Sequence, residues 1–178
     1  MFGTLGVGAG FAIAAKLARP EADVWIVFGD GSCGYSLAEY DTMARHNLGA
    51  VAVVGNDACW TQIVRASPRF AGSAWRWIAW IAELTRLGAQ ARAQVEWFKD
   101  DCGCMLAHTD YHKAAEALGG VGQQVGAGKE ALSGSAEARV ASLRRALEAA
   151  RAAGREGKPV LVNALIGKSS FRDGSISV

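Results

Sequence analysis

The sequence predicts an α/β domain in which helices flank a parallel β-sheet. Three apolar runs have the length and composition of buried strands, at residues 23–28, 50–54 and 160–166. Turn signals that contain glycine follow the first two runs. A capping box, Ser36-x-x-Glu39, predicts a helix between them. Strand, helix and strand in this order predict a βαβ unit with a right-handed crossover, and therefore parallel strands.

The rest of the pattern fits the same fold. Glycine, alanine and apolar periodicity, with breakers such as Pro20, predict four helices. These helices span residues 6–18, 36–46, 111–118 and 136–153. Residues 120–128 read as a weak strand or a loop. We expect a single domain over residues 1–178.

Composition narrows the functional class. Of the 178 residues, 51% are hydrophobic and 20% are charged, which suits a buried core. The net charge of +2 is too small to indicate a nucleic-acid partner. No apolar run is long enough to span a bilayer, and no secretory signal is visible. The four cysteines lack zinc-site spacing and are interpreted as free thiols in a reducing, intracellular compartment.

Oxygen-bearing side chains follow two neighbouring predicted strands. Asp30 comes just after the first strand, and Asn56 and Asp57 come just after the second. Because the carboxyl ends of parallel strands meet at one edge of a sheet, we expect these residues to lie together. Carboxylate and amide oxygens suit Mg²⁺, whose shell is usually completed by phosphates and water. The sequence therefore predicts a site for a metal-bound phosphate at this edge.

The residues beside Asp30 fit a phosphate as well. Gly29 and Gly31 let the backbone approach a phosphate and present its N–H groups. Ser32 adds a hydroxyl donor.

These features resemble thiamine-diphosphate-dependent enzymes, whose motif is Gly-Asp-Gly followed at a set interval by Asn-Asn. The matching stretch here is GDGSCGYSLAEYDTMARHNLGAVAVVGND. In the family, the Asp, an Asn and a backbone carbonyl two residues later bind the metal, which holds the cofactor's diphosphate. Asp57 follows Asp30 by 27 positions, where one branch of the family has the second Asn. Either Asp57 is the ligand, with the carbonyl of Cys59, or Asn56 takes the role through a shifted loop; we favour Asp57.

The resemblance extends along the chain. The segment that begins GTLG resembles the family's Gly-x-Met-Gly segment, which implies that Thr4 and Leu5 contact the aminopyrimidine ring. Trp60 follows the metal loop and is a candidate contact, with packing as the alternative. The stretches FGDG, GYSL, VGND, WTQI, TDYHKAA and FRDGSI resemble acetolactate synthase-like proteins related to 2-hydroxyacyl-CoA lyases.

The resemblance implies the C-terminal thiamine-diphosphate-binding domain of a lyase that cleaves 2-hydroxyacyl-CoA to an aldehyde and formyl-CoA. The alternatives are an acetolactate synthase-type carboligase of 2-keto acids and a non-catalytic fragment. The implied cofactors are thiamine diphosphate and Mg²⁺. No catalytic residue is expected in this chain, because the activating Glu belongs to a pyrimidine-binding domain of the same or a partner subunit. We therefore expect an N-terminally truncated domain, inactive alone, whose parent is a homodimer or tetramer.

Residues 66–93 are an atypical insertion relative to the family. Trp77, Trp80 and Leu84 recur there at helical spacing. Such a helix could bind a membrane surface or a partner, but we favour a retained intron or an ill-packed insert. The compartment cannot be read from the residues. The resemblance suggests association with the endoplasmic reticulum membrane, with cytoplasm or another organelle as alternatives.

Overall fold

The computed structural model describes residues 4–60, 103, 105–126 and 136–166. The chain divides into two compact units. The larger unit comprises residues 2–56 and 108–166. The smaller comprises Met1, 57–107 and 167–178, and is described at 57–60, 103 and 105–107. The predicted insertion at 66–93 lies outside the described residues, and the single domain over 1–178 stays a prediction.

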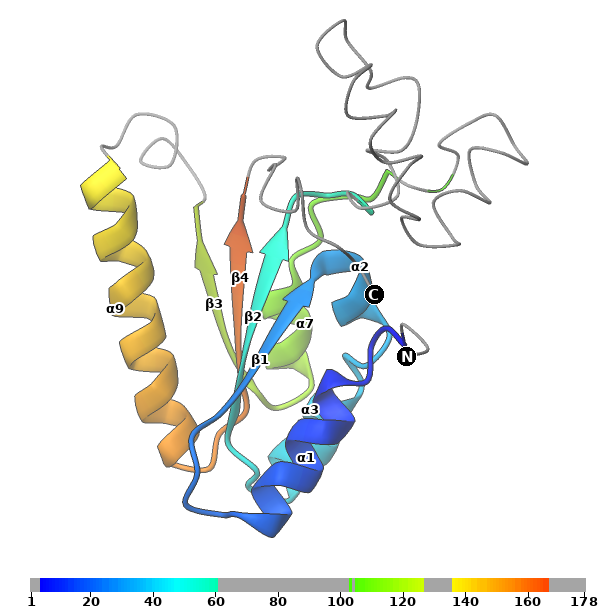
Figure 1. The fold of residues 1–178 in the computed structure, drawn as a ribbon, viewed down its shortest axis with the longest axis vertical. Coiled ribbons are helices and arrows are strands. Elements are labelled where there is room, and N and C mark those ends of the chain that lie inside the picture. Colours follow the sequence, from blue (N-terminus) through cyan, green and yellow to red (C-terminus); the bar gives the residue numbers. More distant parts are fainter. Residues whose placement is uncertain (1–3, 61–102, 104, 127–135, 167–178) are drawn as a thin grey trace, which may run out of the picture. The chain divides into compact units, whose positions relative to one another are not determined.

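The larger unit is built on a parallel four-stranded sheet of order β1-β2-β4-β3 (Figure 1). The strands are β1 Val24–Gly29, β2 Ala50–Asn56, β3 Val121–Val125 and β4 Val160–Leu165. The three apolar runs are thus confirmed as parallel strands. The weakly patterned stretch after residue 120 is also a strand, which pairs with β4.

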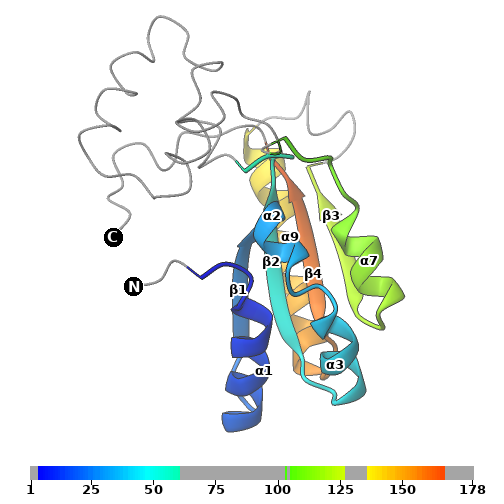
Figure 2. The same cartoon turned by 90° about the vertical axis from the view of Figure 1, so that its right-hand side faces the viewer.

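Helices cover both faces of this sheet. α1 (Gly8–Ala18), α3 (Glu39–Arg45) and α7 (Tyr111–Ala117) lie on one face, and α9 (Ala136–Arg155) lies on the other (Figure 2). The short helix α2 (Asp30–Gly34) follows β1 at its carboxyl end. None of the helices in the described ranges is long and apolar enough to cross a membrane.

The core has two layers because β2 alternates its side chains between the faces. Ala50, Ala52 and Val54 belong to the cluster under α1, α3 and α7, and Val51 packs with α9. Tyr40 of α3 is fully buried in the first layer, and its hydroxyl donates to the carbonyl of Val160 in β4 at 3.2 Å. Burial raises the pKa of this phenol far above its usual range.

The predicted capping box is wrong. α3 begins at Glu39 with Ala38 at the N-cap, and no side chain caps it. The Glu39 amide donates instead to the backbone carbonyl of Ser36 at 3.1 Å. Within the described residues the buried hydroxyl of Ser36 has no hydrogen-bond partner. The helical turns between α2 and α3 satisfy the first amides with backbone carbonyls, so the hydroxyl is not needed.

Within the described residues, one face of β1 is left largely uncovered. Trp25 and Val27 point to the α9 side, but α9 packs against β2, β3 and β4. Trp25 is therefore 41% exposed and Val27 84% exposed. A groove of about 390 Å³ runs between Trp25 and α9, lined by apolar residues that include Leu143 and Leu147. Contact with the sheet is made by smaller residues of α9, such as Ala150.

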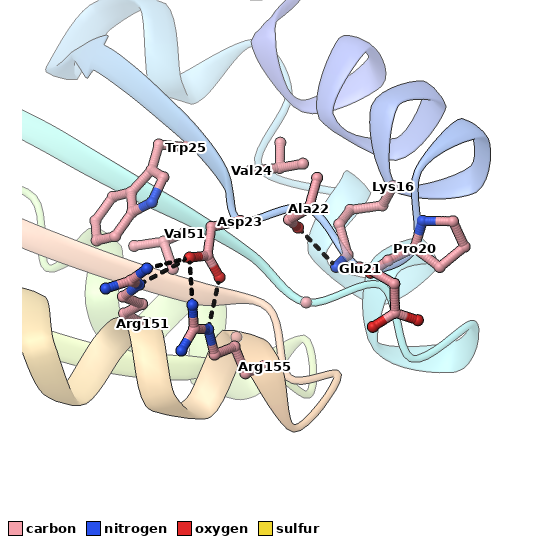
Figure 3. A pocket seen from close by; sticks show the side chains of 12 residues that line it. Lys16, Pro20, Glu21, Ala22, Asp23, Val24, Trp25, Val51, Arg151 and Arg155 are labelled. Carbon is pink, nitrogen blue, oxygen red and sulfur yellow. Dashed lines mark hydrogen bonds and ion pairs between the residues drawn. The ribbon is translucent and has the colours of Figure 1, made fainter.

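A pocket of about 310 Å³ lies at the amino ends of the strands (Figure 3). Asp23 accepts hydrogen bonds there from Arg151 and Arg155 of α9, at 2.7–2.9 Å. Lys16 of α1 donates to the carbonyls of Pro20 and Ala22. The pocket is at the opposite end of the strands from Asp30. Asp23 is paired with two arginines and Lys16 binds two backbone carbonyls, so we assign these groups a structural role.

The Asp23 cluster should make stability depend on pH. Hydrogen bonds from Arg155 and Arg151 lower the pKa of Asp23 from 3.8 to about 2. Its contribution to stability is therefore present above pH 4 and lost as the pH falls toward 2. Asp23→Asn should lower the midpoint of thermal unfolding at pH 7, and the gap to the unaltered chain should close on acidification.

Asp41→Asn is the matched control, because Asp41 pairs with Arg45 on an exposed helix surface and such pairs contribute little. Equal midpoints for Asp23→Asn and the unaltered chain at pH 7 would contradict this role.

Candidate functional site

Asp30 lies at the carboxyl end of β1, as the first residue of α2. Its side chain is 2% exposed, and its Oδ1 accepts a hydrogen bond from the Gly31 amide at 2.8 Å. The turn predicted at residues 29–31 is wrong, because Gly29 is extended and the chain then enters a helix directly. The local backbone therefore holds the Asp30 carboxylate at the strand end.

Asn56 is the last residue of β2, and its side chain is fully buried. In the parallel pairing of β1 with β2, Gly29 is level with Gly55. Asp30 and Asn56 are thus the residues that directly follow a matched pair. The structure places them at one sheet edge, as the sequence predicts, and their role as metal ligands stays a prediction.

A polar residue that the sequence reasoning missed lies at the same edge. Asn163 of β4 is level with Val54 and is fully buried. Its Oδ1 accepts a hydrogen bond from Asn56 Nδ2 at 3.2 Å. The amides of Asn56 and Asn163 both donate to the carbonyl of Thr109, each at 3.1 Å. A single polar residue inside the apolar run VLVNALI was the signal that could have found it.

The segment before α1 lies against α2. The amide of Gly6 donates to Ser32 Oγ at 3.1 Å. The predicted contact residues Thr4 and Leu5 directly precede Gly6, so this hydrogen bond ties their segment to Ser32. Thr4 and Leu5 are exposed. Gly6 has φ of +78°, and a Cβ built on it would lie 2.4 Å from Tyr35 Cβ. Glycine is therefore required at this turn.

The negative charge of Asp30 affects the pKa of two neighbouring groups. Burial, and then the negative charge of Asp30, raise the pKa of the Cys33 thiol to about 12. Burial and then Asp30 also raise the pKa of the Tyr111 phenol. A carboxylate that perturbs two neighbours in this way is weakly screened, which suits it to binding a cation.

The remaining predicted site residues belong to the smaller unit. Asp57 directly follows Asn56 in the chain, and Asp57 and Trp60 are half-buried. Cys59 is buried and forms an isolated antiparallel bridge with Met105, and the Leu106 amide donates to the Ala58 carbonyl at 2.8 Å. These residues thus have local order of their own.

Side chains of the usual charged or soft metal ligands do not gather here. In the part of the chain that the structure describes, no three His, Cys, Asp or Glu residues are placed to hold a metal ion. The predicted set contains only two carboxylates, with an amide and a backbone carbonyl. Such a set leaves several positions on a metal to phosphate and water.

Comparison with known proteins identifies the fold and the family. Residues 1–164 match the family described as thiamine pyrophosphate enzyme, C-terminal TPP binding domain. The chain belongs to this family. Thiamine pyrophosphate is another name for thiamine diphosphate, so the resemblance found in the motifs is confirmed.

Curated relatives match nearly the whole chain. This chain is 45% identical over 177 residues to 2-hydroxyacyl-CoA lyase 2 of Homo sapiens and 44% identical to that of Danio rerio. Both matches cover 99% of this chain and 22% of the relative, so the chain spans about a fifth of their length. A probable acetolactate synthase of Mycobacterium bovis is 52% identical over 59 residues, which are 33% of this chain and 11% of that protein.

A solved structure confirms the predicted fold class. The thiamine diphosphate-dependent 4-hydroxybenzoylformate decarboxylase of Rhodococcus jostii RHA1 aligns with a TM-score of 0.59 at 21% identity. The alignment covers 92% of this chain and 23% of that structure.

The residues present fit the family's cofactor. The buried Asp30 carboxylate and Asn56 lie at the carboxyl ends of neighbouring strands, where ligands of parallel sheets bind. Oxygen donors dominate the predicted ligand set, and this is the donor chemistry that Mg²⁺ prefers.

The Gly6 turn gives a test of how the predicted aminopyrimidine contacts are held. Gly6→Ala should destabilise the chain by about 1–2 kcal/mol, because a left-handed residue acquires a Cβ that clashes with Tyr35. Denaturant titration measures this difference. Gly10→Ala is the matched control: Gly10 lies in α1 with open space around it, so alanine should be neutral or stabilising there. Equal effects of the two substitutions would contradict the reading of the turn.

Proposed function

We propose that this chain is the thiamine-diphosphate- and Mg²⁺-binding part of a carbon–carbon lyase that cleaves 2-hydroxyacyl-CoA to an aldehyde and formyl-CoA. The observation that carries the proposal is the level pairing of Gly29 with Gly55, which puts Asp30 and Asn56 at one edge of the sheet. Identity of about 44% over 99% of the chain to proteins named 2-hydroxyacyl-CoA lyase 2 supports the reaction.

Each residue of the edge has a proposed task. Asp30 binds the metal ion, together with Asp57 and the carbonyl of Cys59; Asn56 is the alternative to Asp57. The two hydrogen bonds that Asn56 Nδ2 donates engage its nitrogen and not its oxygen, so they do not decide between the two ligands. We prefer Asp57 because it follows Asp30 by 27 positions. Gly31 and Ser32 offer N–H and O–H donors to the diphosphate.

The cofactor supplies a nucleophilic thiazolium carbon and an electron sink for breaking the carbon–carbon bond. The chain's own part is to bind and orient. The buried carboxylate of Asp30 and its oxygen partners would hold the metal ion, whose positive charge would offset that of the diphosphate, and the segment at Thr4 and Leu5 would lie beside the ring. No group of this chain is assigned the proton transfer, which we give to a Glu of a pyrimidine-binding domain.

The outer face of α1 supports such a partner domain. Phe11 is 70% exposed and Leu17 is 64% exposed, and the one charged residue of α1, Lys16, is buried. A helix that is apolar on every side is normally covered. We propose that the pyrimidine-binding domain of the same or a partner subunit covers it, in a parent that is a homodimer or tetramer.

A carboligase of the acetolactate synthase type is the second candidate. The match of 59 residues at 52% identity to a probable acetolactate synthase favours it locally. The two reactions share the cofactor edge and differ in substrate, an acyl-CoA or a 2-keto acid. Product analysis of the full-length parent, for formyl-CoA or acetolactate, distinguishes them.

Cofactor binding gives the direct test. Thiamine diphosphate with Mg²⁺ should stabilise the chain, by about 2.7 kcal/mol at a ligand concentration 100 times Kd. Asp30→Asn should abolish the stabilisation, because the metal loses its buried carboxylate. Thermal shift with and without EDTA measures both effects. Asp41→Asn, on the exposed side of α3, is the control and should bind normally.

The same assay separates the two ligand alternatives. Asp57→Asn keeps a ligand oxygen and should bind, whereas Asp57→Ala should not. Stabilisation by ATP or NAD in place of thiamine diphosphate would overturn the proposed function. Normal binding by Asp57→Ala would assign the metal to Asn56.

Catalysis should need more than this chain. Purified alone with both cofactors and a 2-hydroxyacyl-CoA, the chain should release no formyl-CoA, because the activating Glu is expected elsewhere. Chromatographic detection of formyl-CoA measures this, with a full-length 2-hydroxyacyl-CoA lyase as positive control. Turnover by the chain alone would contradict the expectation.

A further inference from the structure

The carbonyl of Thr109 is a junction of three donors. Asn56 Nδ2 and Asn163 Nδ2 each donate to it at 3.1 Å, and the Tyr111 amide donates at 2.9 Å. Asn56 is the last residue of β2, Asn163 lies two residues before the end of the neighbouring strand β4, and Tyr111 is the first residue of α7. The start of α7 is thus tied to the sheet through one backbone atom.

The two asparagines also bind each other. Asn56 Nδ2 donates to Asn163 Oδ1 at 3.2 Å, and both side chains are 0% exposed. They occupy the face of the sheet where Val54 and Leu161 supply apolar side chains one step earlier. An aliphatic pair would continue that layer without the cost of burying amides, so packing alone does not explain their presence.

Tyr111 links the hydrogen bonds at the Thr109 carbonyl to the surroundings of Asp30, the proposed metal ligand. Asn56 directly follows Gly55, which is level with Gly29, and Asp30 directly follows Gly29 as the first residue of α2. Tyr111 belongs to the same buried cluster as Cys33 of α2, and the charge of Asp30 acts on its phenol. Displacing the start of α7 therefore moves Tyr111 within the buried cluster that also holds Cys33, three residues after Asp30.

The hydrogen bonds also fix the orientation of the Asn56 amide. A planar amide carries its oxygen and nitrogen on different branches, and a cation binds only the oxygen. Because Nδ2 faces Thr109 and Asn163, the oxygen of Asn56 lies on the other branch. Asn163 itself is steadied by His112, whose Nδ1 lies 3.4 Å from its Nδ2.

We propose that Asn163 is a positioning residue of the cofactor edge, which fixes Asn56 and the Thr109 carbonyl and thereby the surroundings of Asp30. The inference rests on the proposed function, because it assigns the purpose of this network to binding the metal and diphosphate. Asn163 touches neither group. It acts through Asn56 and through the start of α7.

The test compares two neighbouring residues of β4 that face opposite layers. Asn163→Leu removes the network and keeps a side chain of similar size. Val162→Ala, which empties part of the α9 layer, is the matched control for general loss of stability. Calorimetric titration with thiamine diphosphate and Mg²⁺ is carried out on the full chain, at a temperature where each variant is folded, so that global stability does not enter Kd.

Asn163→Leu should weaken cofactor binding at least about 10-fold, the usual effect of removing a residue that orients a metal site. Val162→Ala should leave Kd unchanged. Asn163→Ala removes the same hydrogen bonds without introducing the bulk of leucine or a buried charge, so its Kd should rise by a similar factor. It also serves as the second variant if Asn163→Leu does not fold.

Hydrogen exchange supplies a readout that needs no ligand. The Tyr111 amide should exchange faster in Asn163→Leu than in Val162→Ala, because its acceptor is no longer held. If the unaltered chain binds the cofactor and Asn163→Leu binds it equally well, the positioning role is overturned and the proposed function stands. If the unaltered chain does not bind the cofactor either, the proposed function fails. In that case the hydrogen exchange of the Tyr111 amide alone tests whether Asn163 anchors the start of α7.

Discussion

The parallel register between β1 and β2 is the constraint on which the candidate site depends. Gly29 is level with Gly55, so the next residue of each strand emerges at the same height on the same edge. A slip of one residue would turn Asn56 to the opposite face of the sheet, away from the layer that holds Asn163 and Thr109. Both faces of β2 are buried, with the small Ala52 in one layer and the larger Val51 in the other, so such a slip would exchange side chains of different size between two packed layers.

Much of this arrangement could be predicted from the sequence, because strong local signals agreed with the fold. Continuous apolar runs gave three strands, and their order with intervening helices gave the parallel sheet. The position of Asp30 and Asn56 followed from those strands without any knowledge of contacts. Strand β3 was only weakly indicated, since two glutamines interrupt its apolar pattern and its pairing with β4 depends on distant residues.

Other features depended on tertiary context and could not be predicted. The Ser36 motif fits a helix cap, but backbone carbonyls of the preceding turn satisfy the same amides. Gly29-Asp30-Gly31 has the composition of a turn, yet the sheet and α2 hold it as the start of a helix. Asn163 could be noticed as a polar interruption, whereas its partner atom on Thr109 lies 54 residues away in the chain.

The unpaired edge of β1 has a consequence for the solubility of the chain. Across the described residues β1 is the last strand of the sheet, and its sequence VWIVFG contains no charge and no proline. Natural sheets usually protect such an edge with lysine, proline or a covering element, since an unprotected one recruits strands from other molecules. If nothing outside the described residues pairs with this edge, the isolated chain should tend to associate through it, so its solubility depends on the edge as well as on the free energy of folding.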